Sequence, residues 1–524
     1  MNNSKFSFLS NHFKMVFLVL FYILYNTFSC FGQQQKQKPP NLLFIMTDQQ
    51  RFDALSYAGN KVLKTPNLDR LAREGAYFVN AHTQMAVCSP ARAAILSGQT
   101  VENTKVLSNR VAYNGQETGI MPNKTFDEIL DENGYHCEYY GKWHTPTFRA
   151  KVYKNPVTVA GKSKSELGVG KKQAYLNFLN PLFPKKKPNE DELMDTFTVR
   201  PYAPDPLDVR HNLKKEGKDY NIKVGQSSIH GVTTIPPEYH VSAFEAGETI
   251  EALERLKDKT FSITCSFHHP HPPYLASKEY SEMFPAKEMT PPESISDDML
   301  NSPYFKTKKR TREGYSDPEK VKYFISEYYA LVKEVDDWIG NILNKLDELG
   351  LIDNTLVVFT SDHGEMLGNH GMVGKFNFYE ESSHVPMLIR FPGRIKPGTV
   401  VKSPTSNMNL FATILDYLNM PKAPSDGESL RGLIENGDDE NAYVVTEWLS
   451  DLTSKPSHMV LKGGWKLMLP HAMGKNVKMA LYNLNKDPHE LNNLLVSESN
   501  KYKSKIAELQ NCFQEWREKT GSKI

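Results

Sequence analysis

The strongest constraint on this fold is a series of short apolar segments that alternate with segments of helical periodicity. Five of the apolar segments are expected to form strands: 41–46, 136–140, 261–267, 355–360 and 385–391. Helices are expected between them at 66–74, 125–132 and 321–349, and the second of these begins with a capping box at Thr125 and Glu128. Strands that alternate with helices form mainly parallel sheets. The pattern therefore predicts an α/β fold with a mainly parallel central sheet and helices on both faces.

Polar side chains follow four of these predicted strands at the point where each strand ends. They are Asp48 and Gln49, then Lys142 and His144, then His268, His269 and His271, and finally Asp362 and His363. The carboxyl ends of parallel strands share one edge of the sheet, where ligands bind in open α/β folds. We therefore expect these side chains to meet at one site although they are far apart along the chain.

The stretch from Cys88 to Gly98 is expected to form a short helix. Ser89 is a suitable N-cap, Pro90 suits the first helical position, and Gly98 stands where the helix would end. Cys88 would then lie just outside a helix N-terminus, where unpaired N–H groups attract anions and favour a thiolate. Because Arg92 opposes the helix dipole, we expect it to hold an anion rather than to stabilise the helix.

A metal site is expected where two of the polar groups meet. Asp48, Gln49, Asp362 and His363 supply two carboxylates, one amide and one imidazole. Mostly oxygen ligation favours a hard divalent cation, calcium more than magnesium, although the imidazole leaves manganese and zinc open. The sequence therefore predicts one divalent cation at this edge of the sheet.

Three motifs carry a resemblance to a known family. Residues 88–92 (CSPAR) match the pattern Cys-x-Pro-x-Arg, and GKWH at 141–144 and SDHG at 361–364 accompany it. On these motifs the chain resembles the type I sulfatases. The resemblance implies an alkaline-phosphatase-like fold, conversion of Cys88 to formylglycine (3-oxoalanine) by a maturation enzyme, and calcium bound by residue 88, Asp48, Asp362 and His363. Gln49 departs from the commoner second aspartate; its amide oxygen can still ligate, but the missing charge weakens the metal site.

The same resemblance implies roles for the remaining catalytic side chains. Lys142 and Lys375 would contact sulfate, and Arg92 and the cation would help to neutralise its oxygens. A hydroxyl of the hydrated aldehyde would attack sulfur, and His271 or Lys375 would protonate the leaving oxygen. His144 would then deprotonate the second hydroxyl, which expels sulfate. His268 and His269 are interpreted as structural.

The two ends of the chain differ from its middle. Residues 1–32 contain an apolar run after Lys5 and Lys14, which predicts a signal peptide and export to the periplasm or the medium. Lipidation of Cys30 is left open, and only then would the protein be held at a membrane. Residues 40–425 are predicted to form the catalytic domain, and 426–524 a smaller α+β domain with an antiparallel sheet and a hairpin at Gly463 and Gly464.

The substrate class follows from charge and from two irregular segments. The net charge of +2 gives no bias toward nucleic acid. Segments 150–240, rich in Lys and Pro, and 285–318 show little periodicity, and long loops of this kind are usually functional or disordered. We expect a sulfated polysaccharide or its oligosaccharides as substrate, with ulvan, carrageenan and glycosaminoglycans all open. Two alternatives are a phosphonate monoester or phosphodiester hydrolase on the same scaffold, and an inactive anion-binding homologue whose Cys88 stays unmodified.

Overall fold

The computed structural model describes residues 38–109, 121–153, 175, 177–182, 197–199, 230–305, 315–496 and 499–524. Residues Pro40–Ile524 form one compact unit. The predicted signal peptide at 1–32, including Cys30, and most of segment 150–240 lie outside the described residues. Within the described part of the chain, no helix has both the length and the apolar character needed to cross a membrane.

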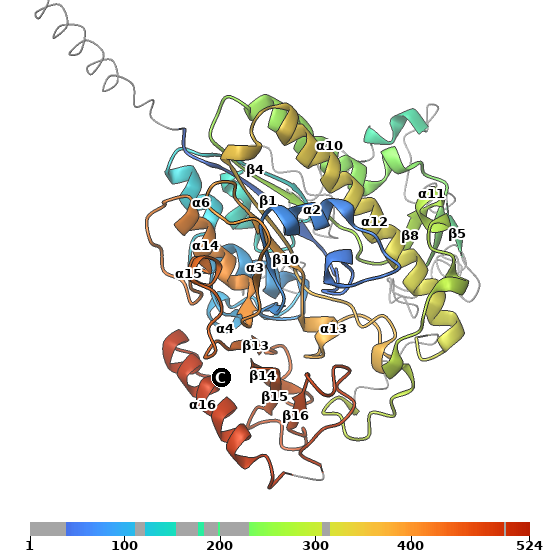
Figure 1. Ribbon diagram of the computed structural model, residues 1–524, viewed down its shortest axis with the longest axis vertical. Helices are drawn as coiled ribbons and strands as arrows, with labels where there is room; N and C mark the ends of the chain where they lie inside the picture. The colour runs from blue at the N-terminus through green and yellow to red at the C-terminus, as the bar shows by residue number, and fades with distance from the viewer. Residues whose placement is uncertain are drawn as a thin grey trace, which may run out of the picture. The chain divides into compact units, whose positions relative to one another are not determined.

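A seven-stranded sheet forms the centre of this unit (Figure 1). Its strands are, in spatial order, β11 (Thr399–Val401), β2 (Ala76–Phe78), β10 (Met387–Arg390), β9 (Thr355–Ser361), β1 (Asn41–Thr47), β7 (Phe261–Ser266) and β4 (His136–Gly141). β1 pairs in parallel with β7 and β9, and β4 pairs in parallel with β7. β10 runs antiparallel to both of its neighbours. The predicted mainly parallel sheet is confirmed, and the four strands with polar residues at their ends point the same way.

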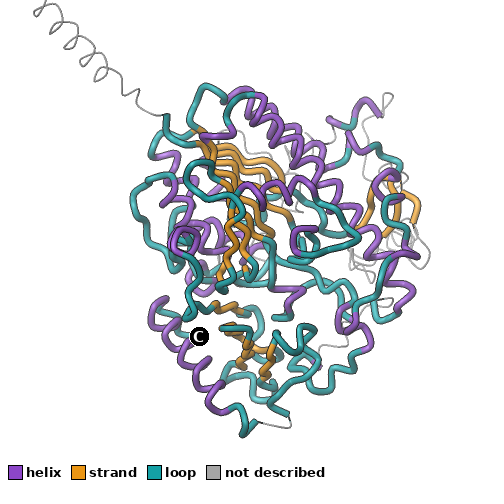
Figure 2. Tube along the Cα trace, viewed as in Figure 1, coloured by secondary structure: helices purple, strands orange, loops and turns teal. Residues whose placement is uncertain are grey.

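Helices cover both faces of this sheet, as predicted (Figure 2). They are α2 (Pro66–Glu74), α3 (Cys88–Ser97), α6 (Phe126–Glu132), α10 (Val241–Leu256), α12 (Pro318–Glu348) and α14 (Leu410–Tyr417). Alternate side chains of a strand point to opposite faces. Leu43 and Ile45 of β1 therefore pack in one core with α2, α10 and α12, while Leu42 and Phe44 pack in a second core with α3, α6 and α14. The predicted capping box begins α6.

The start of α3 differs from the prediction. Val87, in an extended conformation, is the N-cap, and Cys88 is the first helical residue rather than the residue before the helix. The reason is that Ala91 N–H already donates to Val87 O at 3.0 Å. The hydroxyl of Ser89 has no hydrogen-bond partner among the described residues and caps nothing there. The predicted end is confirmed: Gly98 has a φ of 67°, and its N–H donates to Ala94 O at 2.9 Å.

A second, antiparallel sheet lies in the C-terminal part of the chain. It consists of β13 (Val444–Glu447), β14 (Pro456–Lys462), β15 (Trp465–Pro470) and β16 (Ala480–Asn483), and helix α16 (Lys503–Thr520) packs against β14. The predicted hairpin is present between β14 and β15, where Gly463 and Gly464 have positive φ. Lys466, which is fully buried, pairs with Glu380 at 2.7 Å and with Glu490 at 2.9 Å. A domain boundary at 425 stays a prediction.

The other elements are short. β5 (Phe197–Val199), β6 (His230–Thr233) and β8 (Tyr274–Ser277) form a three-stranded sheet that the sequence patterns did not indicate. β3 (Ala81–His82) pairs with β12 (Thr405–Ser406). The remaining α-helices of the described residues are α4 (Val101–Thr104), α11 (Lys278–Glu282), α13 (Glu380–Ser383) and α15 (Arg431–Asn436).

Candidate active site

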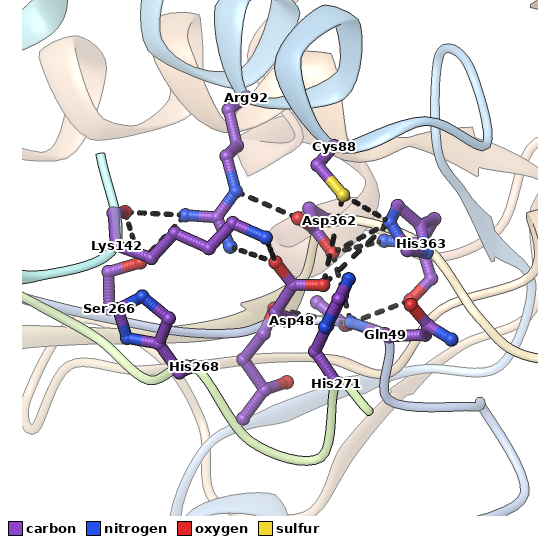
Figure 3. A network of polar contacts seen from close by, with 12 residues as sticks. Asp48, Gln49, Cys88, Arg92, Lys142, Ser266, His268, His271, Asp362 and His363 are labelled. Carbon is purple, nitrogen blue, oxygen red and sulfur yellow. Dashed lines mark hydrogen bonds and ion pairs between the residues drawn. The ribbon is translucent and has the colours of Figure 1, made fainter. Parts of the chain in front are cut away.

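The polar residues that follow the parallel strands converge around the first turn of α3, at the carboxyl edge of the central sheet (Figure 3). One ligand atom from each of Asp48, Cys88, Asp362 and His363 lies within 4.8 Å of the others. All four side chains are buried. The structure thus brings together residues from the ends of β1 and β9 and from α3, as the sequence predicted.

Arg92 holds the two carboxylates of this cluster in place. Its Nε donates to Asp362 Oδ2 at 2.8 Å, and its Nη2 donates to Asp48 Oδ2 at 3.3 Å. Its Nη1 donates to Lys142 O at 2.7 Å and to Ser266 Oγ at 2.8 Å. Because protein acceptors engage all three nitrogens of this fully buried guanidinium, Arg92 supports the carboxylates here. Its contact with sulfate stays a prediction.

Lys142 enters the same cluster from the end of β4. Its ammonium pairs with Asp48 Oδ2. Burial raises the pKa of Asp48, but the positive charges nearby, Lys142 foremost, outweigh burial and hold that pKa well below its ordinary value. The preceding Gly141 has a φ of 92°, and a Cβ at this position would lie 1.9 Å from Ser266 O. Glycine therefore allows β4 to approach β7 closely enough to place Lys142 in the site.

Gln49 bridges two charged side chains. Its amide oxygen accepts a hydrogen bond from Lys375 Nζ, and its amide nitrogen donates to Glu365, whose side chain is fully buried. Its backbone N–H donates to Asp362 Oδ1 at 3.0 Å from a left-handed conformation with a φ of 73°. An aspartate has no N–H group to offer Glu365, which is a physical reason for the amide at this position. Metal ligation by Gln49 stays a prediction.

The thiol of Cys88 is surrounded by cationic and imidazole groups. Its Sγ lies 3.1 Å from His363 Nε2, 3.5 Å from Lys375 Nζ and 3.9 Å from Asp48 Oδ1. Burial and Asp48 raise the pKa of this thiol, but Lys142, Lys375 and His363 outweigh them and hold it well below its ordinary value. The surroundings of residue 88 therefore stabilise negative charge.

Two further histidines lie beside this centre. Burial lowers the pKa of His144, although a hydrogen bond with Cys88 acts in the opposite direction. Burial also lowers the pKa of His271 to about 3. His271 Nδ1 lies 2.7 Å from Pro272 O, so in the neutral ring Nδ1 carries the proton and Nε2 is the acceptor. Both rings therefore favour the neutral form, and the catalytic roles of His144 and His271 stay predictions.

Sequence reasoning missed three residues that support the site. Ser266 ends β7 and accepts a hydrogen bond from Arg92, and Glu365 stands directly after SDHG and accepts one from Gln49. Their positions next to the strand ends were the available signal. Glu245 of α10 is buried and pairs with His268 Nδ1, and no local pattern marks it. His269 Nδ1 contacts Ser242 Oγ at 2.8 Å. The structural interpretation of His268 and His269 stays a prediction.

The donor set fits the predicted divalent cation. His363 Nδ1 lies 2.9 Å from Gly364 O and therefore carries the proton, which leaves the Nε2 lone pair facing the cluster. Nε2 lies 3.5 Å from Asp362 Oδ1 and 3.9 Å from Asp48 Oδ1. Two buried carboxylates and one imidazole oriented toward them suit a divalent cation; the carboxylates favour calcium, and the imidazole leaves manganese and zinc open.

The chain is similar to several known proteins. A family model described as Sulfatase matches residues 40–420, and one described as N-sulphoglucosamine sulphohydrolase, C-terminal, matches residues 368–519. An N-acetylglucosamine-6-O-sulfatase of Bacteroides thetaiotaomicron is 26% identical and the alignment covers 92% of this chain and 87% of the relative. An ulvan-active sulfatase of Formosa agariphila is 30% identical over 78% of this chain and 67% of its own length. The crystal structure of a phosphonate monoester hydrolase of Agrobacterium radiobacter superimposes with a TM-score of 0.72 at 24% identity, covering 92% and 96% of the two chains.

Proposed function

Because this chain belongs to the sulfatase family, we propose that it hydrolyses sulfate monoesters on a sulfated polysaccharide or its oligosaccharides, with residue 88 as formylglycine and one calcium ion. Two relatives support a carbohydrate substrate by their names, one acting on N-acetylglucosamine sulfate and one on ulvan. The proposal includes export from the cytoplasm and a maturation enzyme that modifies Cys88.

One observation carries the proposal: Cys88 lies against a preformed group of two carboxylates and an imidazole, with two lysines beside it. Asp48, Asp362 and His363 would hold the cation. The cation would supply positive charge next to residue 88 and next to an oxygen of the sulfate. Formylglycine at residue 88 would supply the hydroxyl nucleophile. The chain's own cations, Lys142 and Lys375, would orient the sulfate and offset its charge.

The protonation states of His144 and His271 indicate which groups would accept and which would donate a proton. His144, neutral and in contact with residue 88, would accept a proton from a hydroxyl there. His271 is also held neutral, so its Nε2 is an acceptor and a poor acid at neutral pH. Of the two groups that the resemblance offers for the leaving oxygen, we therefore favour Lys375, whose ammonium has protons to donate.

The test begins with mass spectrometry of the peptide that contains residue 88. Release of free sulfate is then measured on a panel of defined sulfated oligosaccharides, with matched phosphonate monoesters and phosphate diesters. We expect sulfate release, a formylglycine mass at residue 88, and no turnover by a folded Cys88→Ala variant. Faster hydrolysis of the phosphonates would favour the alternative hydrolase, and an unmodified Cys88 without turnover would favour an anion-binding protein.

A further inference from the structure

A second group of metal-ligating side chains lies outside the candidate active site. It consists of His240, His269 and Glu334, and one ligand atom from each lies within 4.8 Å of the others. His240 directly precedes α10, Glu334 belongs to α12, and His269 belongs to the loop after β7, two residues before His271. α10 and α12 run side by side on one face of the sheet (Figure 1). The group therefore joins two helices to the loop that carries a predicted catalytic histidine.

The Nδ1 atom of each histidine of this group has a partner, a prospective ligand for His240 and a serine for His269. His240 Nδ1 lies 2.8 Å and 2.7 Å from the two carboxylate oxygens of Glu334. His269 Nδ1 lies 2.8 Å from Ser242 Oγ. The two rings are 5.0 Å apart between centroids. Ser242 thus holds Nδ1 of His269 and leaves its Nε2 for a metal, as outer partners of metal-ligating histidines do. His240 and Glu334 would hold the ion between Nδ1 and the carboxylate, in place of the proton that they share.

The charge of this group is not balanced by a permanent cation. Glu334 has 0% of its surface exposed, and its ion-pair partner among the described residues is His240, with no lysine or arginine in contact. Neighbouring Lys333 pairs with Asp337 instead. A buried carboxylate is costly unless it is paired and fully hydrogen-bonded. A divalent cation shared with two imidazoles would meet that need.

A similar group elsewhere in the chain shows what a balanced arrangement looks like. His82, Glu380 and His384 also lie within ligand distance of one another. There the ammonium of Lys466 pairs with Glu380, and both ring nitrogens of His384 are engaged, by Glu380 at 2.9 Å and by Val79 O at 2.8 Å. The charge of Glu380 is therefore balanced without a metal.

We propose that His240, His269 and Glu334 bind one divalent transition metal of the zinc class, which fastens the His271 loop to α10 and α12. Two imidazoles and one carboxylate, with water in the fourth position, are a donor set that zinc accepts. Ligand atoms around tetrahedral zinc stand about 3.3 Å apart, so His240 Nδ1 and Glu334 would move apart by about 0.5 Å while His269 approaches them by about 1.5 Å or less. The ion would act on catalysis only through the position of the loop.

The experiment measures zinc on the purified full chain. The protein is stripped with a chelator, saturated with calcium to fill the active site, equilibrated with zinc, and desalted before elemental analysis. We expect about one equivalent of zinc in the wild type, lost in His240→Gln and in Glu334→Gln. His82→Gln, from the balanced group, and Asp362→Asn, from the active site, should retain that zinc. Cobalt in place of zinc should give the strong visible absorption of a four-coordinate ion.

The outcomes separate the proposal from its alternatives. Equal zinc in the wild type and in the two ligand variants would overturn it and leave His240 and Glu334 as an imidazolium–carboxylate pair. Loss of zinc in Asp362→Asn alone would place the ion in the active site and would equally overturn it. Should a ligand variant fail to fold, wild-type cobalt protein without tetrahedral absorption bands would overturn the proposal by itself.

Discussion

Replacement of Gln49 by Glu tests whether the amide is present because it must donate and accept at once. In the structure this amide accepts from Lys375 and donates to Glu365. Glu365 is fully buried and also accepts from the backbone N–H of Leu367, at 3.0 Å, and of Gly374. Gln49→Glu keeps the size of the side chain but turns its donor into a second carboxylate oxygen.

The expected cost follows from the distance between the two groups. Two carboxylates at a hydrogen-bond separation of about 3 Å repel by about 5 kcal/mol at an effective dielectric constant of about 20. The pair would instead keep a proton, so the repulsion becomes a raised pKa, at about 1.4 kcal/mol per unit. Stronger pairing with Lys375 offsets part of this cost. We expect Gln49→Glu to lower the free energy of unfolding by about 2 to 3 kcal/mol at neutral pH, in line with the loss of a hydrogen bond to a charged group.

A double-mutant cycle isolates this interaction. Urea unfolding is measured without calcium for the wild type, Gln49→Glu, Glu365→Gln and the double variant, which exchanges the amide and the carboxylate between the two positions. The double variant restores one donor between them, so it should regain at least half of the summed loss. A single variant as stable as the wild type, or strictly additive losses in the double variant, would refute the bridging role of the amide.

Three further predictions concern other parts of the structure. Asp362→Asn should lower calcium content and sulfate release together, because the cation loses one charged ligand and Arg92 loses its charged partner at 2.8 Å. Calcium is measured by elemental analysis, and an unchanged calcium stoichiometry would count against the site. Lys466→Met should destabilise the chain by about 3 kcal/mol or more in urea unfolding, because it leaves Glu380 and Glu490 buried without their cation. Burial raises the pKa of Asp127 to about 7, so the folded state favours the protonated carboxyl group. The contribution of this group to the free energy of unfolding is fully present below about pH 4 and is lost as the pH rises through about 7. Relative to Asp127→Asn, the wild type should therefore lose stability over that interval, and parallel pH profiles of unfolding would contradict the assignment.

The sheet and the meeting of its polar residues could be predicted from the sequence because both follow from local patterns. β1 and β9 are apolar runs that end in Asp48 and Asp362, and parallel pairing brings such ends to one edge. The start of α3 could not be predicted in the same way. Ser89 has a high preference for the N-cap, yet the extended Val87 takes that position, because the backbone before the helix sets where the first turn closes.

The contacts between the site residues were harder to predict from the sequence than the identity of the residues that form the site. Glu365 and Glu245 act on residues distant in the chain, Gln49 and His268. Glu365 stands directly after SDHG, whereas no local pattern marks Glu245. The small sheet of β5, β6 and β8 was missed because its strands have three to four residues each, too few to show an alternating pattern. Side-chain partners across the chain depend on packing that no local window contains.

The three cations of the active site differ in how firmly the protein holds them, and this difference sorts their roles. Arg92 donates to two carboxylates, a carbonyl and a hydroxyl, and none of its side chain is exposed. Lys142 and Lys375 each end in a single ammonium on a flexible stem and keep 7% and 8% of their surface exposed. Asp48 is one of the residues that would hold the predicted cation, and its carboxylate would then no longer need the ammonium of Lys142 for charge balance. We expect Lys142 to be free to contact an incoming sulfate, while Arg92 stays in place as the support of the carboxylates.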